Sequence, residues 1–196
     1  MTLVSDDNKH PLDSGHPLLK NVDRVLIDRD SIQKRISELG RQISQDYAGD
    51  ELVVVGVLKG SLPFMAELVK HIEVPMVMDF VATSTYVGGL QSTGVVRFQK
   101  DVEEVLNNRN VLVVEDIVDS GITLRYLTDM MRLRNPKSLE ICCLIDKPFH
   151  RKTDIYPKYR GFVIPDRFII GFGLDYEESY RNLDFIGILS PAAIAP

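Results

Sequence analysis

The sequence predicts an α/β domain in which helices flank a mostly parallel β-sheet. One observation is the set of short apolar runs at 52–57, 111–114 and 139–145, which are rich in valine and isoleucine. Such runs are typical of strands buried on both faces of a parallel sheet. The other observation is that helical patterns lie between the runs, as expected of βαβ units. A chain of 196 residues has the length of one such domain.

Composition excludes several classes of protein. The 28 acidic residues outnumber the 23 basic ones, which argues against a protein held to nucleic acid mainly by phosphate neutralisation. No apolar run approaches the roughly 20 residues that span a bilayer, and residues 1–19 lack the pattern of a signal peptide. Cys142 and Cys143 are adjacent in a strand, so we expect two buried thiols and no disulfide framework. A cytoplasmic enzyme without a nucleic-acid or membrane partner is therefore predicted.

The first part of the chain is predicted to be an arm followed by a helix. Residues 1–22 contain prolines and little periodicity, so the domain itself is expected to be 23–196. Asp30 and Ser31 are the expected helix cap. The apolar residues that follow are spaced by four, three, four and four, which predicts one buried helical stripe. These residues are Ile32, Ile36, Leu39, Ile43 and Tyr47.

The later elements alternate in type. Ser61 is a candidate helix cap and Pro63 falls in the first turn of that helix. A strand is expected at 77–86, and the glycine-rich segment 87–94 is expected to be a mobile loop. After the strand at 111–114 comes a helix, then the strand at 139–145. Short strands are expected in RFIIGF and FIGIL near the end of the chain.

The segment VLVVEDIVDSGITL, residues 111–124, contains the clearest chemical signal. Its strand brings Glu115 and Asp116 to the carboxyl end of a parallel sheet, where open α/β sheets bind ligands. Two adjacent carboxylates suit ribose hydroxyls, a divalent metal, or both. The turn 119–123 leads directly into a helix, whose free N–H groups and positive dipole end favour a phosphate.

Parts of this segment also fit three different structures. A hydrophobic strand followed by Glu-Asp also describes a Walker B element, but the chain contains no GxxxxGK[ST]. An acidic cluster like that of a response regulator leaves the Ser-Gly-x-Thr turn unexplained. An ordinary strand end and helix cap would account for the short pieces separately, but poorly for fourteen residues in order.

The segment 111–124 closely resembles the phosphoribosyl-pyrophosphate motif of the type I phosphoribosyltransferases. Other segments resemble the hypoxanthine-guanine phosphoribosyltransferases in particular: LKGS at 58–61, Ser84-Thr85-Tyr86, LIDKP around Lys147, and 164–183. The resemblance covers roughly residues 25–190. It departs from some members at the serines of LKGS and DSG and at the start of the loop after Tyr86.

The resemblance implies the type I phosphoribosyltransferase fold, with a small hood formed by the chain ends, mainly 160–196. The implied reaction joins hypoxanthine or guanine to the ribose 5-phosphate of phosphoribosyl pyrophosphate and releases pyrophosphate. The products would be IMP or GMP. A homodimer or homotetramer is expected, and Mg²⁺ is the expected cofactor.

The resemblance also implies a role for each site residue. Asp119 is expected near purine N7 as the general acid/base, where an anion stabilises the developing charge. The expected ribose and phosphate ligands are Glu115, Asp116, Ser120, Gly121, Ile122 and Thr123. The expected pyrophosphate ligands are Lys59, Gly60, Thr85, Tyr86 and Arg181. The expected purine ligands are Lys147, Phe168, Ile169 and Asp175. Magnesium is expected at Glu115, Asp116 and Asp175.

Some of these residues could instead have ordinary structural roles. A lysine at a strand end is usually a solvated charge, Phe168 would be core by default, and Arg181 would be a surface charge. The four histidines share no metal-binding spacing, and His150 is expected at the surface. A regulatory relative that binds RNA or DNA is the competing function, and a different base is the competing specificity. The preference among hypoxanthine, guanine and xanthine stays open, as does dimer versus tetramer.

Overall fold

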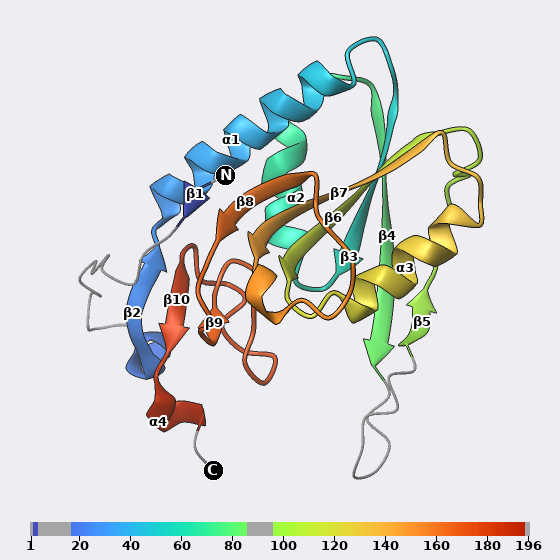
Figure 1. Ribbon diagram of the computed structural model, residues 1–196. Coiled ribbons are helices and arrows are strands. Elements are labelled where there is room, and N and C mark those ends of the chain that lie inside the picture. The colour runs from blue at the N-terminus through green and yellow to red at the C-terminus, as the bar shows by residue number, and fades with distance from the viewer. Residues whose placement is uncertain (1, 4–16, 86–95, 195–196) are drawn as a thin grey trace.

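The computed structural model describes residues 2–3, 17–85 and 96–194, and it contains a seven-stranded main sheet (Figure 1). The strand order is β1-β8-β7-β6-β3-β4-β5. In this order the strands are β1 (Thr2–Leu3), β8 (Tyr159–Val163), β7 (Ser138–Asp146), β6 (Asn110–Val118), β3 (Leu52–Leu58), β4 (Met76–Thr85) and β5 (Val96–Lys100). Every neighbouring pair is parallel except β4 and β5. The predicted α/β class with a mostly parallel sheet is confirmed.

Helices cover both faces of this sheet (Figure 1). On one face, α1 (Arg29–Asp46) and α2 (Leu62–Leu68) pack over Val54, Leu112 and Cys142. On the other face, α3 (Ile122–Arg132) packs over residues one position along in the strands, including Val113 and Cys143. Both cysteines are fully buried, as predicted, and burial raises the pKa of both thiols. The middle of each central strand is apolar on both sides because each face of the sheet packs against a helical layer.

A second, three-stranded sheet is built from both ends of the chain. Its order is β2 (Val22–Ile27), β10 (Ile186–Leu189) and β9 (Ile169–Ile170), all antiparallel. It has a small core of its own. Figure 1 shows it near the carboxyl ends of β7 and β8. The remaining short elements are η1 (Pro17–Asn21), η2 (Val69–His71), η3 (Pro148–His150) and α4 (Pro191–Ile194).

Helix starts differ from the sequence predictions. Asp28, not Asp30 or Ser31, caps α1: its Oδ1 accepts from the Ser31 backbone N–H at 2.7 Å. Asp28 directly follows β2, so the chain is still extended there and turns into the helix two residues earlier than expected. Ser61 does occupy the cap position of α2, but its backbone is helical and its hydroxyl donates to the Val57 carbonyl at 2.6 Å. It therefore provides no side-chain cap.

Strand ends and the predicted arm also differ from expectation. β6 continues to Val118, so Glu115 and Asp116 lie within the last part of the strand rather than after it. The described parts of the predicted arm are attached: β1 pairs with β8, and the Ser190 N–H donates to the Asn21 carbonyl at 2.8 Å. The predicted loop 87–94 lies outside the described residues. Among the described helices, none is long and apolar enough to cross a membrane.

Candidate active site

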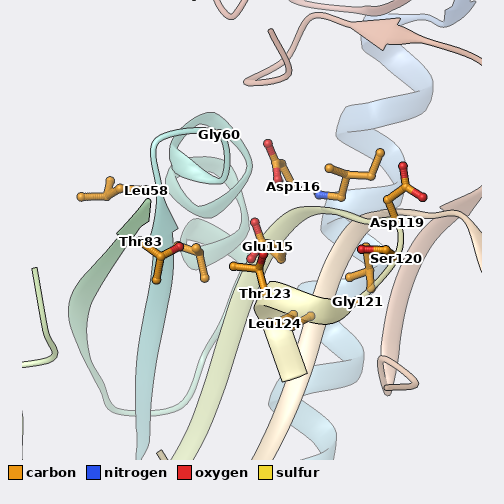
Figure 2. A pocket seen from close by; sticks show the side chains of 13 residues that line it. Leu58, Gly60, Thr83, Glu115, Asp116, Asp119, Ser120, Gly121, Thr123 and Leu124 are labelled. Atoms are coloured by element: carbon orange, nitrogen blue, oxygen red, sulfur yellow. Dashed lines mark hydrogen bonds between the residues drawn. The ribbon is translucent and has the colours of Figure 1, made fainter. Parts of the chain in front are cut away.

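A cavity of about 310 Å³ lies at the carboxyl ends of β3, β4 and β6 (Figure 2). Parallel strands place their carboxyl ends on one edge, so segments far apart in sequence meet there. Figure 2 shows Leu58 and Thr83 at one end of the cavity and Asp119 and Ser120 at the other. The lining residues are Val57, Leu58, Gly60, Thr83, Glu115, Asp116, Ile117, Val118, Asp119, Ser120, Gly121, Thr123 and Leu124. Most of the predicted ribose and phosphate ligands therefore surround one cavity.

The turn after β6 opens the amino end of α3 toward this cavity. Gly121 has φ of 78°, a left-handed conformation that glycine adopts without strain. A Cβ at this position would also lie 2.5 Å from Thr153 Oγ1, so glycine is needed for space as well. The helix begins immediately, because the Arg125 N–H donates to the Gly121 carbonyl at 2.8 Å. The first N–H groups of a helix have no acceptor within the helix. Here the Ile122 N–H donates to Ser120 Oγ at 3.5 Å, a long contact that an anionic ligand could replace.

The segment 147–153 braces this turn through hydrogen bonds to its backbone carbonyls. The backbone N–H groups of Lys147 and Lys152 donate to the Val118 and Ser120 carbonyls, both at 2.9 Å. The Arg151 guanidinium, whose side chain is only 7% exposed, donates through Nε to the Asp119 carbonyl at 2.9 Å and forms an ion pair with Asp146. Asp146 is itself buried. The turn is therefore held in shape before any ligand binds.

Two neighbouring carboxylates dominate the electrostatics of the cavity. Asp116 is buried and Glu115 is partly exposed to the cavity. Burial and the adjacent Asp116 carboxylate hold the pKa of Glu115 well above its ordinary value. Burial also raises the pKa of Asp116, although the Arg181 charge opposes this. Such a pair favours a cation, and Mg²⁺ is commonly bound by one or two carboxylates together with substrate oxygens.

Asp175 does not join this pair. Its carboxylate accepts from the Glu178 N–H at 3.0 Å and forms an ion pair with Arg181 Nη2 at 2.9 Å. Within the described ranges, no three His, Cys, Asp or Glu side chains form a group that could hold a metal ion. The structure thus brings together two of the three residues expected at the metal, because Arg181 holds the third.

The loop after β3 is packed tightly between two other segments. A Cβ on Gly60 would lie 1.7 Å from Asp116 Oδ2, and a Cβ on Gly173 would lie 2.0 Å from the Gly60 carbonyl oxygen. Lys59 is exposed, and its Nζ contacts Glu178 Oε2 at 2.8 Å. The peptide bond between Leu58 and Lys59 is cis. The predicted pyrophosphate loop therefore lies between the carboxylate pair and the segment 171–181.

Arg181 belongs to that segment and holds it together. Its Nη1 donates to the Gly173 carbonyl at 2.8 Å, and its Nη2 contacts both Asp175 and Glu178. Its buried Nε has no hydrogen-bond partner within the part of the chain that the structure describes. Thr85 ends β4, and Tyr86 lies outside the described residues.

A second group of predicted residues meets beside the turn. Lys147 is buried, its Nζ donates to the Arg167 carbonyl at 2.6 Å, and the same Nζ lies 3.9 Å from Asp119 Oδ2. Phe168 follows Arg167, is 44% exposed, and contacts Tyr176 edge-on at 5.5 Å. Lys147 is therefore not a solvated surface charge, and Phe168 is not a core residue. Ile169 is buried in β9.

Sequence reasoning missed several residues of the site. Leu58 and Thr83 line the cavity. Leu58 belongs to the LKGS segment but was not singled out as a ligand, and Thr83 carried no signal beyond its place near a strand end. His150 is exposed, as expected, but sequence reasoning missed that its imidazole lies between the carboxylates of Asp119 and Asp166, at 3.2 and 2.8 Å. Its position three residues after Lys147, in the η3 turn, was the available signal.

A mostly parallel α/β sheet with an acidic pair, a turn into a helix and a buried lysine at one edge is the arrangement expected of a phosphoribosyltransferase. The phosphoribosyl transferase domain family matches residues 27–177. A hypoxanthine-guanine phosphoribosyltransferase of Bacillus subtilis (strain 168) is 46% identical over 172 residues, which are 88% of this chain and 96% of the relative. The enzyme of that name from Streptococcus pneumoniae (strain ATCC BAA-255 / R6) is 47% identical with the same coverage.

A solved structure gives the same result. The crystal structure of a hypoxanthine phosphoribosyltransferase from Staphylococcus aureus superposes with a TM-score of 0.89 and 43% sequence identity. The match covers 94% of this chain and all of that one. The chain belongs to the hypoxanthine-guanine phosphoribosyltransferase family of phosphoribosyltransferases.

Proposed function

We propose that this chain is a purine salvage transferase of the cytoplasm. It joins hypoxanthine or guanine to the ribose 5-phosphate of phosphoribosyl pyrophosphate and releases pyrophosphate, giving IMP or GMP. The observation that supports this best is the contact between Lys147 and Asp119 beside the turn that opens α3. This contact places a cation, an anion and the turn side by side. The cation suits the 6-oxo group of a purine, the anion suits its N7, and the turn suits the phosphate of the ribose.

The ribose phosphate is assigned to the end of β6 and the turn after it. The 5-phosphate binds the N–H groups at the start of α3, including those of Gly121 and Ile122, with the hydroxyls of Ser120 and Thr123 as further donors. The ribose hydroxyls donate to Glu115 and Asp116. A hydrogen bond to a charged group contributes about 1.5–3 kcal/mol. This orientation directs C1 of the ribose toward Asp119.

The pyrophosphate is assigned to the loop after β3 and the segment opposite it. Backbone donors of Lys59 and Gly60 face one side, and the partnerless Nε of Arg181 suits an anionic oxygen on the other. We propose that Thr85 and Tyr86 complete this subsite. Mg²⁺ held by Glu115 and Asp116, and by Asp175 if Arg181 releases it, would offset the charge of the leaving pyrophosphate.

The base is assigned to the space between Lys147 and Phe168. The Lys147 ammonium has donors only, so it favours the 6-oxo group of hypoxanthine or guanine over the 6-amino group of adenine. The half-exposed ring of Phe168 offers a face for stacking, and the Ile169 backbone lies next along β9. Asp175, the remaining predicted purine ligand, follows Ile169 in the chain. The preference among hypoxanthine, guanine and xanthine remains a matter for kinetics.

Asp119 is assigned as the general acid/base at purine N7. Its side chain is 46% exposed, so a ligand can reach it, and Lys147 Nζ approaches one of its oxygens. As N9 attacks C1, positive charge develops on the purine ring, and an anion at N7 stabilises it and accepts the proton.

Two further features of the proposal concern partners. A nucleic-acid-binding relative would need a basic face, whereas this chain has a net charge of −5. A homodimer or homotetramer is proposed from the resemblance to the hypoxanthine-guanine phosphoribosyltransferases. The two ends of the chain, joined in the β2-β10-β9 sheet, form the hood of this enzyme.

The test is Asp119→Asn, which keeps the shape of the side chain and removes its charge. The kcat for formation of IMP should fall by about 10²–10⁴-fold. The affinity for phosphoribosyl pyrophosphate should change little, because the turn that binds it is unaltered. Asp154→Asn is the matched control, since Asp154 is exposed and pairs with Arg125 away from the cavity. A variant that keeps more than about half of the activity would disprove this role of Asp119.

A further inference from the structure

His150 lies between two carboxylates that come from different parts of the chain. Its Nδ1 is 3.2 Å from Asp119 Oδ1, in the turn after β6. Its Nε2 is 2.8 Å from Asp166 Oδ2, in the segment between β8 and β9. The side chains of His150 and Asp119 are 44% and 46% exposed. The contact is therefore at the mouth of the site, where a ligand can reach Asp119.

Both nitrogens of the imidazole face a carboxylate oxygen. A neutral imidazole has one donor nitrogen and one acceptor nitrogen, whereas an imidazolium has two donors. In either form, an N–H of His150 faces a carboxylate oxygen to which it can donate. Such charge-assisted hydrogen bonds are stronger than neutral ones.

Other charged groups contact the same two aspartates, through a carboxylate or through the backbone carbonyl. Lys147 Nζ lies 3.9 Å from the second oxygen of Asp119, from the end of β7. Arg151 donates to the backbone carbonyl of Asp119. Arg167 donates to the backbone carbonyl of Asp166 at 3.0 Å. The two oxygens of Asp119 thus face two different side chains, the imidazole of His150 and the ammonium of Lys147.

We propose that His150 is a positioning residue for Asp119. It holds one carboxylate oxygen while Lys147 approaches the other, and Asp166 fixes the orientation of the imidazole. A carboxylate on a half-exposed side chain otherwise samples several rotamers, and misplacement of a catalytic group by about 1 Å can cost up to 100-fold in rate. This inference rests on the proposed role of Asp119 as the general acid/base.

The first experiment compares two substitutions at His150. His150→Phe removes both donors, and kcat should fall about tenfold while KM for phosphoribosyl pyrophosphate stays within about twofold. His150→Asn retains one amide donor that can reach Asp119, and it should recover kcat to within about threefold of the unaltered enzyme. His71→Asn is the control, since His71 lies in η2, away from the cavity. Thermal unfolding should be similar in all of them, because His150 is half-exposed.

The second experiment repeats His150→Phe in the Asp119→Asn background. If His150 acts through Asp119, the second substitution should lower kcat by less than about twofold, since neighbouring residues of one network are not additive. A full tenfold loss in that background would overturn the proposal.

The outcomes separate this inference from the proposed function. If His150→Phe keeps full kcat while Asp119→Asn loses it, His150 does not position Asp119, but the proposed function stands. If Asp119→Asn itself keeps full kcat, the proposed role of Asp119 fails, and the inference about His150 fails with it. Equal loss in the phenylalanine and asparagine variants would also contradict it, because the donor would then be irrelevant.

Discussion

Two walls of the active site are held in different ways. The turn at 118–121 is braced by hydrogen bonds from the segment 147–153, including those of the nearly buried Arg151 side chain. The opposite segment, 171–181, is joined to the loop after β3 by the ion pair between Lys59 and Glu178, whose side chains are 71% and 65% exposed. Exposed ion pairs are weak, whereas a buried charge that loses its partner is costly.

The backbones of the two walls differ as well. Four non-glycine residues of the segment 171–181 have positive φ, and only two isolated bridges give it regular pairing. The turn at 118–121, in contrast, lies between β6 and α3. This comparison indicates that the turn at 118–121, the proposed ribose-phosphate wall, is the more firmly held of the two. The segment 171–181, the proposed wall for pyrophosphate and base, has less regular pairing.

The largest effect should come from a matched pair of substitutions, one in each wall. Arg151→Met leaves the buried Asp146 carboxylate with one distant cation, Arg160 at 3.4 Å, and should lower the free energy of unfolding by about 3–5 kcal/mol. Lys59→Met breaks only an exposed pair and should lower it by less than about 1 kcal/mol. Urea denaturation measures both. Equal losses of stability in the two variants would show that the two walls are held equally strongly.

A smaller effect on stability is expected at the loop after β3, which lies between Asp116 and the segment 171–181. Gly60→Ala would put a Cβ within 1.7 Å of Asp116 Oδ2, so either the loop or the carboxylate must move. Stability should fall by about 1–3 kcal/mol, and KM for phosphoribosyl pyrophosphate should rise about tenfold.

Gly49→Ala is the control for this substitution. Gly49 has φ of 85° and open space around it, so the change costs only backbone strain of about 1–2 kcal/mol. It should leave KM unaltered. If Gly60→Ala also leaves KM unaltered, the tight packing of the loop is unimportant for binding.

Lys147 connects the turn at 118–121 to the segment between β8 and β9, because it contacts Asp119 and the Arg167 carbonyl. Lys147→Ala should raise KM for guanine and hypoxanthine about tenfold, since a charged donor to the 6-oxo group is lost. The affinity for phosphoribosyl pyrophosphate should change much less. Steady-state kinetics with each substrate varied in turn measures this, with Lys152→Ala as an exposed control. Equal effects on both substrates would mean that Lys147 is structural or binds phosphate.

The last prediction concerns how the stability of the protein depends on pH. The pKa of Glu115 is raised in the folded protein by burial and by Asp116. The folded state therefore binds more protons than the unfolded state above the ordinary glutamate pKa of about 4.3, and stability falls as pH rises through that window. Glu115→Gln should remove this loss, so its melting temperature should exceed that of the unaltered chain more at pH 7.5 than at pH 5. Added Mg²⁺ with phosphoribosyl pyrophosphate should reduce the difference. Parallel curves without ligand would contradict the assignment.

Local patterns sufficed for much of the fold. The strands β3, β6 and β7 were predicted because each is a continuous apolar run, and the α1 stripe was predicted because its spacing is helical. The strands β2, β5 and β8 were missed. Each mixes charged and apolar residues over five or six positions, so no period is evident. Strand β9 has only two residues, and its pairing with β10 is a contact between distant segments.

The sequence by itself determined the acidic pair, the turn at 119–123 and the presence of Lys147, because each depends on neighbouring residues and on a strand or helix end. Tertiary structure alone decided that Arg151 braces that turn, that Arg181 engages Asp175, and that His150 lies between Asp119 and Asp166. Arg181 meets Asp175 because the segment 171–181 folds back on itself. The contacts of Arg151 and His150 join segments from different strand ends. They arise because parallel strands bring their carboxyl ends to one edge of the sheet, and no local pattern encodes which side chains then meet.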